Sequence, residues 1–358
     1  MKIQFSRAEI GTLGGAAAAT GLAAFTAHAD VGEVPAFVAA AAALSLLAAT
    51  VGAATEQLGH RLGPGATGML QAAFGNLPEL LICLFSLRAG LVDVVRGALV
   101  GAVLANTLLV LGLAILVGGL RHGTQRFPTE TPRMVATMLV LAVAALAVPT
   151  LAHVLHTPAQ AHEATLSAAC AVVLLVLFAC SLPFSLKANP AMVAANPDAK
   201  TELEHAWPIG QSLVVLGAAG LAAALASEWF VDALLPATKA IGLTEGFTGL
   251  VVVAIAGNAV ENVVGIKLAA QNKPDYALSV ILNSALQVAL ALTPVLVLAS
   301  FVIAPAPLTL VLPPLLVAAL GLTVGVTALI VSDGESIWLE GVALLCLYAM
   351  IAAAFFWG

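Results

Sequence analysis

Long apolar stretches, separated by short polar connections, cover nearly the whole chain of 358 residues. A transmembrane helix needs about 20 consecutive, mostly apolar residues, and windows of that length recur throughout the sequence. The pattern predicts an all-α polytopic membrane protein with about eleven transmembrane helices. The predicted spans are 8–27, 35–57, 65–88, 93–118, 133–152, 163–185, 207–231, 245–270, 275–301, 305–331 and 336–357.

The first of these spans has features of two kinds of segment. Lys2 and Arg7 precede an Ala/Gly-rich stretch ending in Ala27–Ala29, a pattern typical of a cleavable signal peptide. Glu9, near the start of the apolar run, and the low leucine content leave both a signal peptide and a retained helix open. The ten spans that follow keep the same orientation in either case.

Composition supports the membrane assignment and excludes several functional classes. The chain is 61% hydrophobic and only 9% charged, whereas soluble domains carry about 25% charged residues. It has no basic cluster for nucleic acid and no phosphate-loop signature for a nucleotide. All four cysteines lie in apolar runs, where we expect free thiols that pack. We therefore expect no cofactor and no enzymatic activity; the oligomeric state is not indicated.

The placement of lysine and arginine predicts the orientation in the membrane. With the N-terminus in the cytoplasm, all of the 13 basic residues except Arg88, Arg96 and Lys239 lie on the cytoplasmic side. We therefore predict a multi-pass protein of the cytoplasmic (inner) membrane, with a cytoplasmic N-terminus if it is uncleaved. The C-terminus is then external.

The ten spans after the first divide into two sets of five. An odd number of spans per repeat places the two repeats in opposite orientations in the membrane. We predict an N-terminal helix (1–34), a first repeat (35–186), a cytoplasmic linker (187–206) and a second repeat (207–358).

Two short motifs inside apolar stretches carry the candidate chemistry. Gly75–Glu79 (Gly-Asn-Leu-Pro-Glu) and Gly257–Glu261 (Gly-Asn-Ala-Val-Glu) lie 182 positions apart, one in each predicted repeat. An ionisable residue at membrane depth costs roughly 3 kcal/mol or more, so it usually serves a function. Matching interrupted segments in the two repeats indicate a transporter's substrate site near the midplane. Glu79 and Glu261 are therefore the candidate ligands of a cation or of protons.

The other residues of each motif suit the same site. Asn76 lies three residues before Glu79, as Asn258 does before Glu261, so each pair shares one face of a helix. Gly75 and Gly257 permit a local break, and Pro78 removes a backbone donor, which frees carbonyl oxygens. Carboxylates and carbonyls are the ligands that Ca²⁺ prefers. A polar packing motif between helices is the alternative interpretation.

Polar residues on the following helices are candidates to line the same site. Asn106 follows the first motif, and Asn283, Ser284 and Gln287 follow the second, with Asn283 and Gln287 on one face. Such amides also simply bond between helices, at about 0.6 kcal/mol each.

Two further glutamates, Glu56 and Glu228, stand at the predicted ends of the first helices of the repeats. They are either proton-entry groups or solvated helix-end acids. The outer loop from His153 to Glu163, with His156 and His162, matches no standard metal-ligand spacing and reads as a solvated loop.

Taken together, these motifs resemble the cation/proton exchangers of the calcium/cation antiporter superfamily, in the bacterial calcium/proton branch. The family's Gly-Asn-Ala-Thr-Glu and Ser-Asn-Leu-Leu-Leu-Val-Leu-Gly signatures are similar to Gly75–Glu79 and Ala105–Gly112. Its Gly-Asn-Ala-Ala-Glu-His and Ser-Ser-Thr-Gln-Ile-Ala-Leu runs are similar to Gly257–Asn262 and Asn283–Leu290. The Gly118–Phe127 loop is also similar.

The resemblance implies one extra N-terminal helix plus two inverted five-helix repeats, and alternating access in which Glu79 and Glu261 bind the cation. It implies Ca²⁺ export in exchange for H⁺, with inorganic cations and the bilayer as the partners. Asn262 stands where the family often has His, and Pro78 where it often has Thr, so a Na⁺(K⁺)/H⁺ antiporter on the same fold remains an alternative. A gated cation channel is an alternative of another class.

Overall fold

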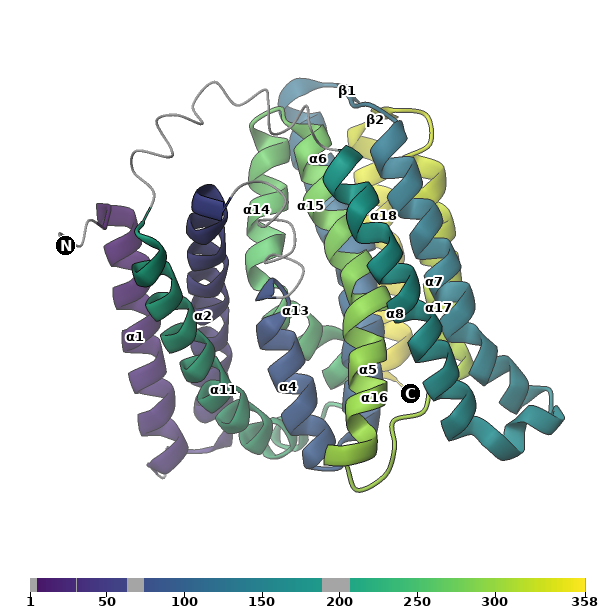
Figure 1. The fold of residues 1–358 in the computed structure, drawn as a ribbon, viewed down its shortest axis with the longest axis horizontal. Coiled ribbons are helices and arrows are strands. Elements are labelled where there is room, and N and C mark those ends of the chain that lie inside the picture. The colour runs from purple at the N-terminus through teal and green to yellow at the C-terminus, as the bar shows by residue number, and fades with distance from the viewer. Residues whose placement is uncertain (1–4, 30, 63–73, 189–206, 358) are drawn as a thin grey trace. The chain divides into compact units, whose positions relative to one another are not determined.

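The protein is built almost entirely from apolar helices in the part that the computed structural model describes, residues 5–29, 31–62, 74–188 and 207–357 (Figure 1). In this part, eight helices are long and apolar enough to cross a membrane, and two shorter apolar helices accompany them. The prediction of an all-helical multi-pass membrane protein is confirmed. Most of the predicted linker 187–206 lies outside the described residues.

The chain divides into two compact units, of which the first comprises residues 1–85 and 179–242. Its helices are α1 (Arg7–His28), α2 (Glu33–Leu62), most of α4 (Leu77–Arg88) and α11 (Ile209–Ala240). α2 packs against both α1 and α11 (Figure 1). Small side chains such as Ala43 and Ala223 are fully buried there, which allows close packing of helix on helix without a large core. Phe37 and Phe230 stack with ring centroids 4.8 Å apart.

The second unit comprises residues 86–178 and 243–358. Its first elements are α5 (Val92–Leu104), the π-helix η1 (Ala105–Val110), α6 (Leu111–His122), strand β1 (Gln125–Arg126), α7 (Glu130–Val154), the 3₁₀ helix η2 (Pro158–His162) and most of α8 (Glu163–Ala188). The later elements are α12 (Glu245–Phe247), the π-helix η3 (Thr248–Val253), α13 (Ala254–Gly257), α14 (Ala259–Ala270), α15 (Pro274–Gln287), the π-helix η4 (Val288–Leu292), α16 (Thr293–Ile303), α17 (Pro314–Ile330), β2 (Glu335–Ser336) and α18 (Trp338–Phe356).

The continuous segment of α5, η1 and α6 lies at the centre of the second unit, and most of its residues are buried. Leu104, Leu108 and Leu111 have no exposed surface. Around it pack α14, α15, α18 and η3. A helix that is apolar on all sides is suited to this central position because it has no polar face to present to water.

A two-stranded antiparallel ladder joins two connections at one end of this unit. β1 pairs with β2 in the register Gln125 to Ser336 and Arg126 to Glu335, and the Arg126 Nε and Glu335 Oε1 atoms lie 3.0 Å apart. Gln125 is buried and donates from Nε2 to the carbonyl of Ala269 near the end of α14, at 3.3 Å. The ladder therefore joins the α6–α7 connection to the α17–α18 connection, and the Gln125 side chain joins it to α14.

One predicted span begins later than the hydropathy pattern indicated. Residues 305–313, expected to be helical, form an extended segment, and α17 begins only at Pro314. Pro305, Pro307 and Pro313 explain the difference, because proline lacks the amide hydrogen of a helix interior and its ring clashes with the preceding turn. We call Leu308–Leu312 the strap. Its alternate residues Leu308, Leu310 and Leu312 are buried, as in a β-strand.

The two glutamates predicted at helix ends, Glu56 and Glu228, lie inside helices instead. α2 continues to Leu62 and α11 to Ala240, since a helix does not need apolar residues to maintain its backbone hydrogen bonds beyond the apolar run. Both side chains are exposed.

Candidate functional site

The backbone of the first motif turns at its Gly-Asn pair, where the sequence predicted a local break. Gly75 and Asn76 form a turn, and α4 begins at Leu77. Pro78 is therefore in the first turn of α4, where a missing amide hydrogen costs no helical bond. Glu79 is the third residue of α4, and its side chain is only 6% exposed. The fold therefore places a buried carboxyl group in the first turn of a helix.

The second motif has the same backbone arrangement. α13 ends at Gly257, Asn258 forms a turn, and α14 begins at Ala259, so Glu261 is also the third residue of its helix. The side chains of residues 259–262, including Glu261 and Asn262, lie outside the described part. In both copies, therefore, an asparagine occupies the break and a glutamate the first turn that follows.

Asn258 is fully buried and makes bonds on both sides of its amide. Its Nδ2 donates at 3.1 Å to the carbonyl of Ala254, the first residue of α13, which also accepts the backbone amide of Asn258 at 3.2 Å. Its Oδ1 accepts from Nδ2 of Asn106, 3.2 Å away. Both the backbone amide and the side chain of Asn258 therefore stabilise the break in the helix.

Three polar side chains from three segments form one buried cluster in the second unit. Asn106 Nδ2 also lies 3.2 Å from Oγ of Ser284, and Ser284 Oγ lies 3.5 Å from Oδ1 of Asn258. We call Asn106, Asn258 and Ser284 the amide cluster. All three are buried among apolar helices, and Asn106 has no exposed surface.

The amide cluster leaves one acceptor available. Oδ1 of Asn106 is buried and has no hydrogen-bond partner among the residues that the structure describes. An unsatisfied buried acceptor costs about 1–3 kcal/mol, and a bound ion or water would remove that cost. A neutral carbonyl oxygen is a hard ligand that suits Ca²⁺ or Na⁺ but cannot neutralise its charge.

Each segment of the amide cluster contains or adjoins a π-helical stretch. Asn106 lies in η1, while η3 ends five residues before Asn258 and η4 begins four residues after Ser284. Inserting an extra residue into a helix in this way is often associated with functional sites, because it rotates the side chains that follow. Nothing in the hydropathy pattern predicts these stretches.

Not every predicted site residue reaches the amide cluster. Asn283 is half-buried and donates to the carbonyl and hydroxyl of Ser279, one turn earlier on α15, at 2.7 and 3.3 Å. Gln287, one turn later on the same face, is also half-buried. Ser284, which the sequence indicated both as a lining candidate and as a possible proton or gating residue, makes the cluster contacts instead.

Two of the histidines in the outer loop each bond to a side chain of the same loop region. His153 Nδ1 lies 2.5 Å from Oε1 of Glu163, and His156 Nδ1 lies 3.2 Å from Oε1 of Gln160. Among the described residues, no group of three or more His, Cys, Asp or Glu side chains could hold a metal ion.

Comparison with known proteins places this arrangement in a family. The family model described as "Sodium/calcium exchanger protein" matches residues 33–187 and 211–357. The "Ca(2+)/H(+) antiporter" of Aphanothece halophytica is 37% identical over 342 residues, which cover 90% of each chain. The "Ca(2+)/H(+) antiporter ChaA" of Bacillus subtilis is 36% identical over 316 residues, which cover 87% of this chain and 88% of that protein.

Solved structures show the same fold. The native structure of YfkE has a TM-score of 0.81 and 31% identity, with 97% of this chain and all of that chain covered. An H⁺/Ca²⁺ exchanger CAX has a TM-score of 0.74 at 16% identity, which supports the fold alone. The resemblance found in the motifs is confirmed, and the protein is a transporter rather than an enzyme. The chain belongs to the sodium/calcium exchanger protein family, in the calcium/proton antiporter branch of the calcium/cation antiporter superfamily.

Proposed function

We propose that this protein exports cytoplasmic Ca²⁺ in exchange for external H⁺ by alternating access, with Glu79 and Glu261 binding either the cation or protons. The relatives named above as Ca²⁺/H⁺ antiporters support the ion pair. The observation that carries the role of Glu79 is its burial at the start of a helix that follows a Gly-Asn break.

Charge balance provides the physical basis of the exchange. Two carboxylates neutralise one Ca²⁺, and two protons neutralise the same carboxylates. The empty, doubly ionised pair is the costly state, because uncompensated charges are poorly solvated away from water. Conformational change is therefore favoured only with Ca²⁺ or protons bound, which couples the two fluxes.

The amide cluster would supply neutral oxygen ligands. The free Oδ1 of Asn106 supports this role, since Ca²⁺ takes six to eight oxygens and two carboxylates cannot provide them all. Gly75 and Gly257 would permit the breaks, Asn76 and Asn258 would occupy them, and Asn283 and Gln287 remain less direct candidates.

We predict that Glu79→Gln abolishes Ca²⁺/H⁺ exchange without loss of folding, because the amide keeps the shape but cannot balance the cation. The assay is Ca²⁺-induced dissipation of a pH gradient in proteoliposomes containing the purified protein. Glu33→Gln is the matched control: Glu33 is also in the first turn of a helix but is exposed. Substantial exchange by folded Glu79→Gln would refute the role of Glu79.

The same vesicles test the second candidate, a Na⁺(K⁺)/H⁺ antiporter, which the departure at Asn262 favours. A pH gradient dissipated by Na⁺ or K⁺ but not by Ca²⁺ would select it. Cation flux down its own gradient without any counter-movement of protons would instead indicate a channel.

A further inference from the structure

Within the described residues, the strap makes no hydrogen bond to another stretch of backbone, and side-chain hydroxyls accept from its alternate amides. Non-helical backbone between apolar helices is tolerated only where its polar groups find partners. The amides of alternate strap residues donate to hydroxyls from three helices: Leu308 to Ser300 Oγ at 2.7 Å, Leu310 to Ser167 Oγ at 2.9 Å and Leu312 to Thr150 Oγ1 at 2.9 Å. Thr150 Oγ1 in turn donates to the carbonyl of Leu310 at 3.1 Å.

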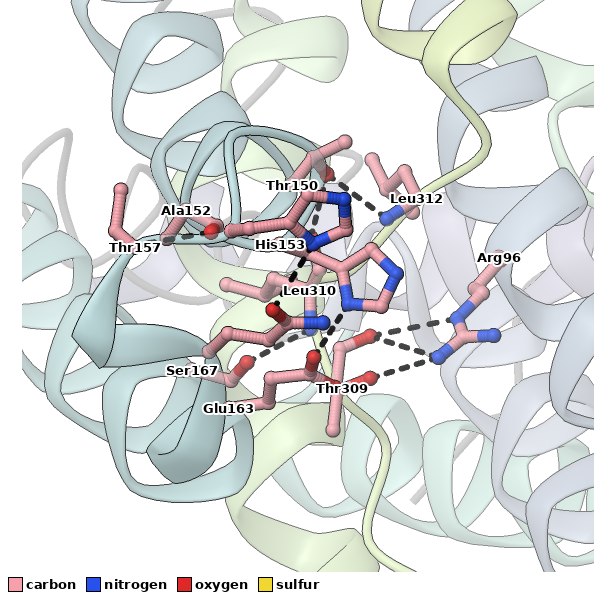
Figure 2. A network of polar contacts seen from close by, with 12 residues as sticks. Arg96, Thr150, Ala152, His153, Thr157, Glu163, Ser167, Thr309, Leu310 and Leu312 are labelled. Carbon is pink, nitrogen blue, oxygen red and sulfur yellow. Dashed lines mark hydrogen bonds and ion pairs between the residues drawn. The ribbon is translucent and has the colours of Figure 1, made fainter.

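On the side that faces α5, the strap is bonded to a charged side chain rather than to hydroxyls. Figure 2 shows the side chain of Arg96 reaching Thr309 from α5, while Thr150 and Ser167 approach from α7 and α8. Arg96 donates from Nη2 to Oγ1 of Thr309 at 2.8 Å, and from Nε and Nη2 to the carbonyl of Thr309 at 3.4 Å. Its Nη1 lies 3.1 Å from Oδ1 of Asp93.

Packing between the strap and α5 is incomplete. A cavity of about 20 Å³, enough for about one water molecule, lies between them. Its lining includes Leu99, Val100 and Val103 of α5, together with Arg96 and strap residues. Because apolar contact is interrupted there, the bonds from Arg96 are the polar contacts that fix Thr309 against α5.

The position of α5 matters for the amide cluster. α5 continues directly into η1, so Arg96 and Asn106 lie on one uninterrupted helical segment, ten residues or about 15 Å apart. The strap is bonded to α16, α8 and α7, so a displacement of α5 along the strap would change the axial position of Asn106 relative to those helices.

We propose that Arg96 is a positioning residue for transport: by binding Thr309 it holds the strap on α5, and thereby holds Asn106 in place. The proposal rests on the proposed function for its effect on exchange. The effect on the strap itself is independent of that function.

The test measures both effects in the purified full-length protein. In Arg96→Gln, we expect the amides of the strap to exchange with deuterium about tenfold faster, since a hydrogen bond from a charged donor is stronger than one between neutral groups. We expect Ca²⁺/H⁺ exchange in proteoliposomes to fall several-fold, and Arg96→Lys, which keeps the charge but loses the planar fork, to restore it in part.

Two further variants separate this role from a general loss of stability. Thr309→Val removes the hydroxyl but keeps the shape, so it should shift both readouts in the same direction by less, and add little when Arg96→Gln is already present. It also provides the test if Arg96→Gln does not fold. Asp93→Asn is the matched control, because the Asp93 side chain is 69% exposed and its pair with Arg96 should contribute little.

Unchanged deuterium exchange of the strap in folded Arg96→Gln or Thr309→Val would overturn the proposal. So would a loosened strap with an undiminished transport rate. Failure of the proposed function is distinguishable, because exchange retained by Glu79→Gln leaves the deuterium result unaffected.

Discussion

At the scale of single residues, neighbouring side chains on one helix have different roles. Ser284 joins Asn106 and Asn258, whereas Asn283 bonds within its own helix to Ser279. Adjacent residues of a helix point about 100° apart, so a one-position difference decides which side chain reaches the cluster. Asn283 has more hydrogen-bonding groups than Ser284, yet Ser284 is the residue that reaches the amide cluster.

This contrast yields a prediction for paired substitutions. Asn106→Leu should reduce Ca²⁺/H⁺ exchange at least tenfold and destabilise the protein by about 1–3 kcal/mol, because it removes the amide donor that Asn258 Oδ1 and Ser284 Oγ share. Asn283→Leu should retain most of the exchange, since only a bond within α15 is lost. Rates in proteoliposomes and thermal unfolding in detergent measure both. Equal losses in the two variants would contradict the assignment.

At the scale of elements, glycine allows helices of the second unit to approach one another closely. Gly97 and Gly101 on α5 face η3, where a methyl group on Gly101 would lie 2.7 Å from Cα of Leu250. On α6, a methyl group on Gly112 would lie 3.0 Å from the carbonyl oxygen of Gly341 on α18. Such contact suits a membrane interior, where dispersion between closely packed backbones, rather than the hydrophobic effect, holds helices together.

We predict that Gly101→Ala destabilises the protein by about 1–3 kcal/mol, because backbone atoms rather than a flexible side chain would have to move. Thermal unfolding of the purified protein measures the loss. Gly325→Ala on α17 is the control, since no atom lies within 4 Å of the added methyl group. That variant should be neutral or slightly stabilised by the better helix propensity of alanine. A stable Gly101→Ala variant would mean that the two segments can separate at little cost.

At the scale of the whole molecule, the two ranges matched by the family model, 33–187 and 211–357, nearly coincide with the two predicted repeats. Each compact unit nevertheless contains segments of both ranges, since residues 1–85 group with 179–242 and residues 86–178 with 243–358. The inverted relation of the repeats, the count of eleven spans and the signal-peptide question stay predictions.

Orientation is the property of the whole molecule that is simplest to test. We predict an external C-terminus, because only Arg88, Arg96 and Lys239 of the 13 basic residues lie outside in that topology. Alkaline phosphatase fused after Trp357 should be active, and the same reporter fused after Arg126 should be inactive. A C-terminal reporter that works only in the cytoplasm would refute the odd number of spans.

Features that depend on local composition follow from the amino-acid sequence alone. Apolar runs predict membrane helices because each residue's transfer free energy adds along the segment. The breaks at Gly75 and Gly257 follow from local backbone freedom, and the motifs around them are sufficient to indicate the family.

Contacts between residues that are distant in the chain depend instead on how the helices pack in three dimensions. The prolines around the strap indicate that a helix is unfavourable there, but the extended form depends on Thr150 and Ser167, more than 140 positions earlier in the chain. The partnership of Arg96 with Thr309 spans 213 positions, and the choice of Ser284 over Asn283 depends on the rotation of α15 against η1. Such contacts depend on the packing of many helices at once, and no local pattern encodes them.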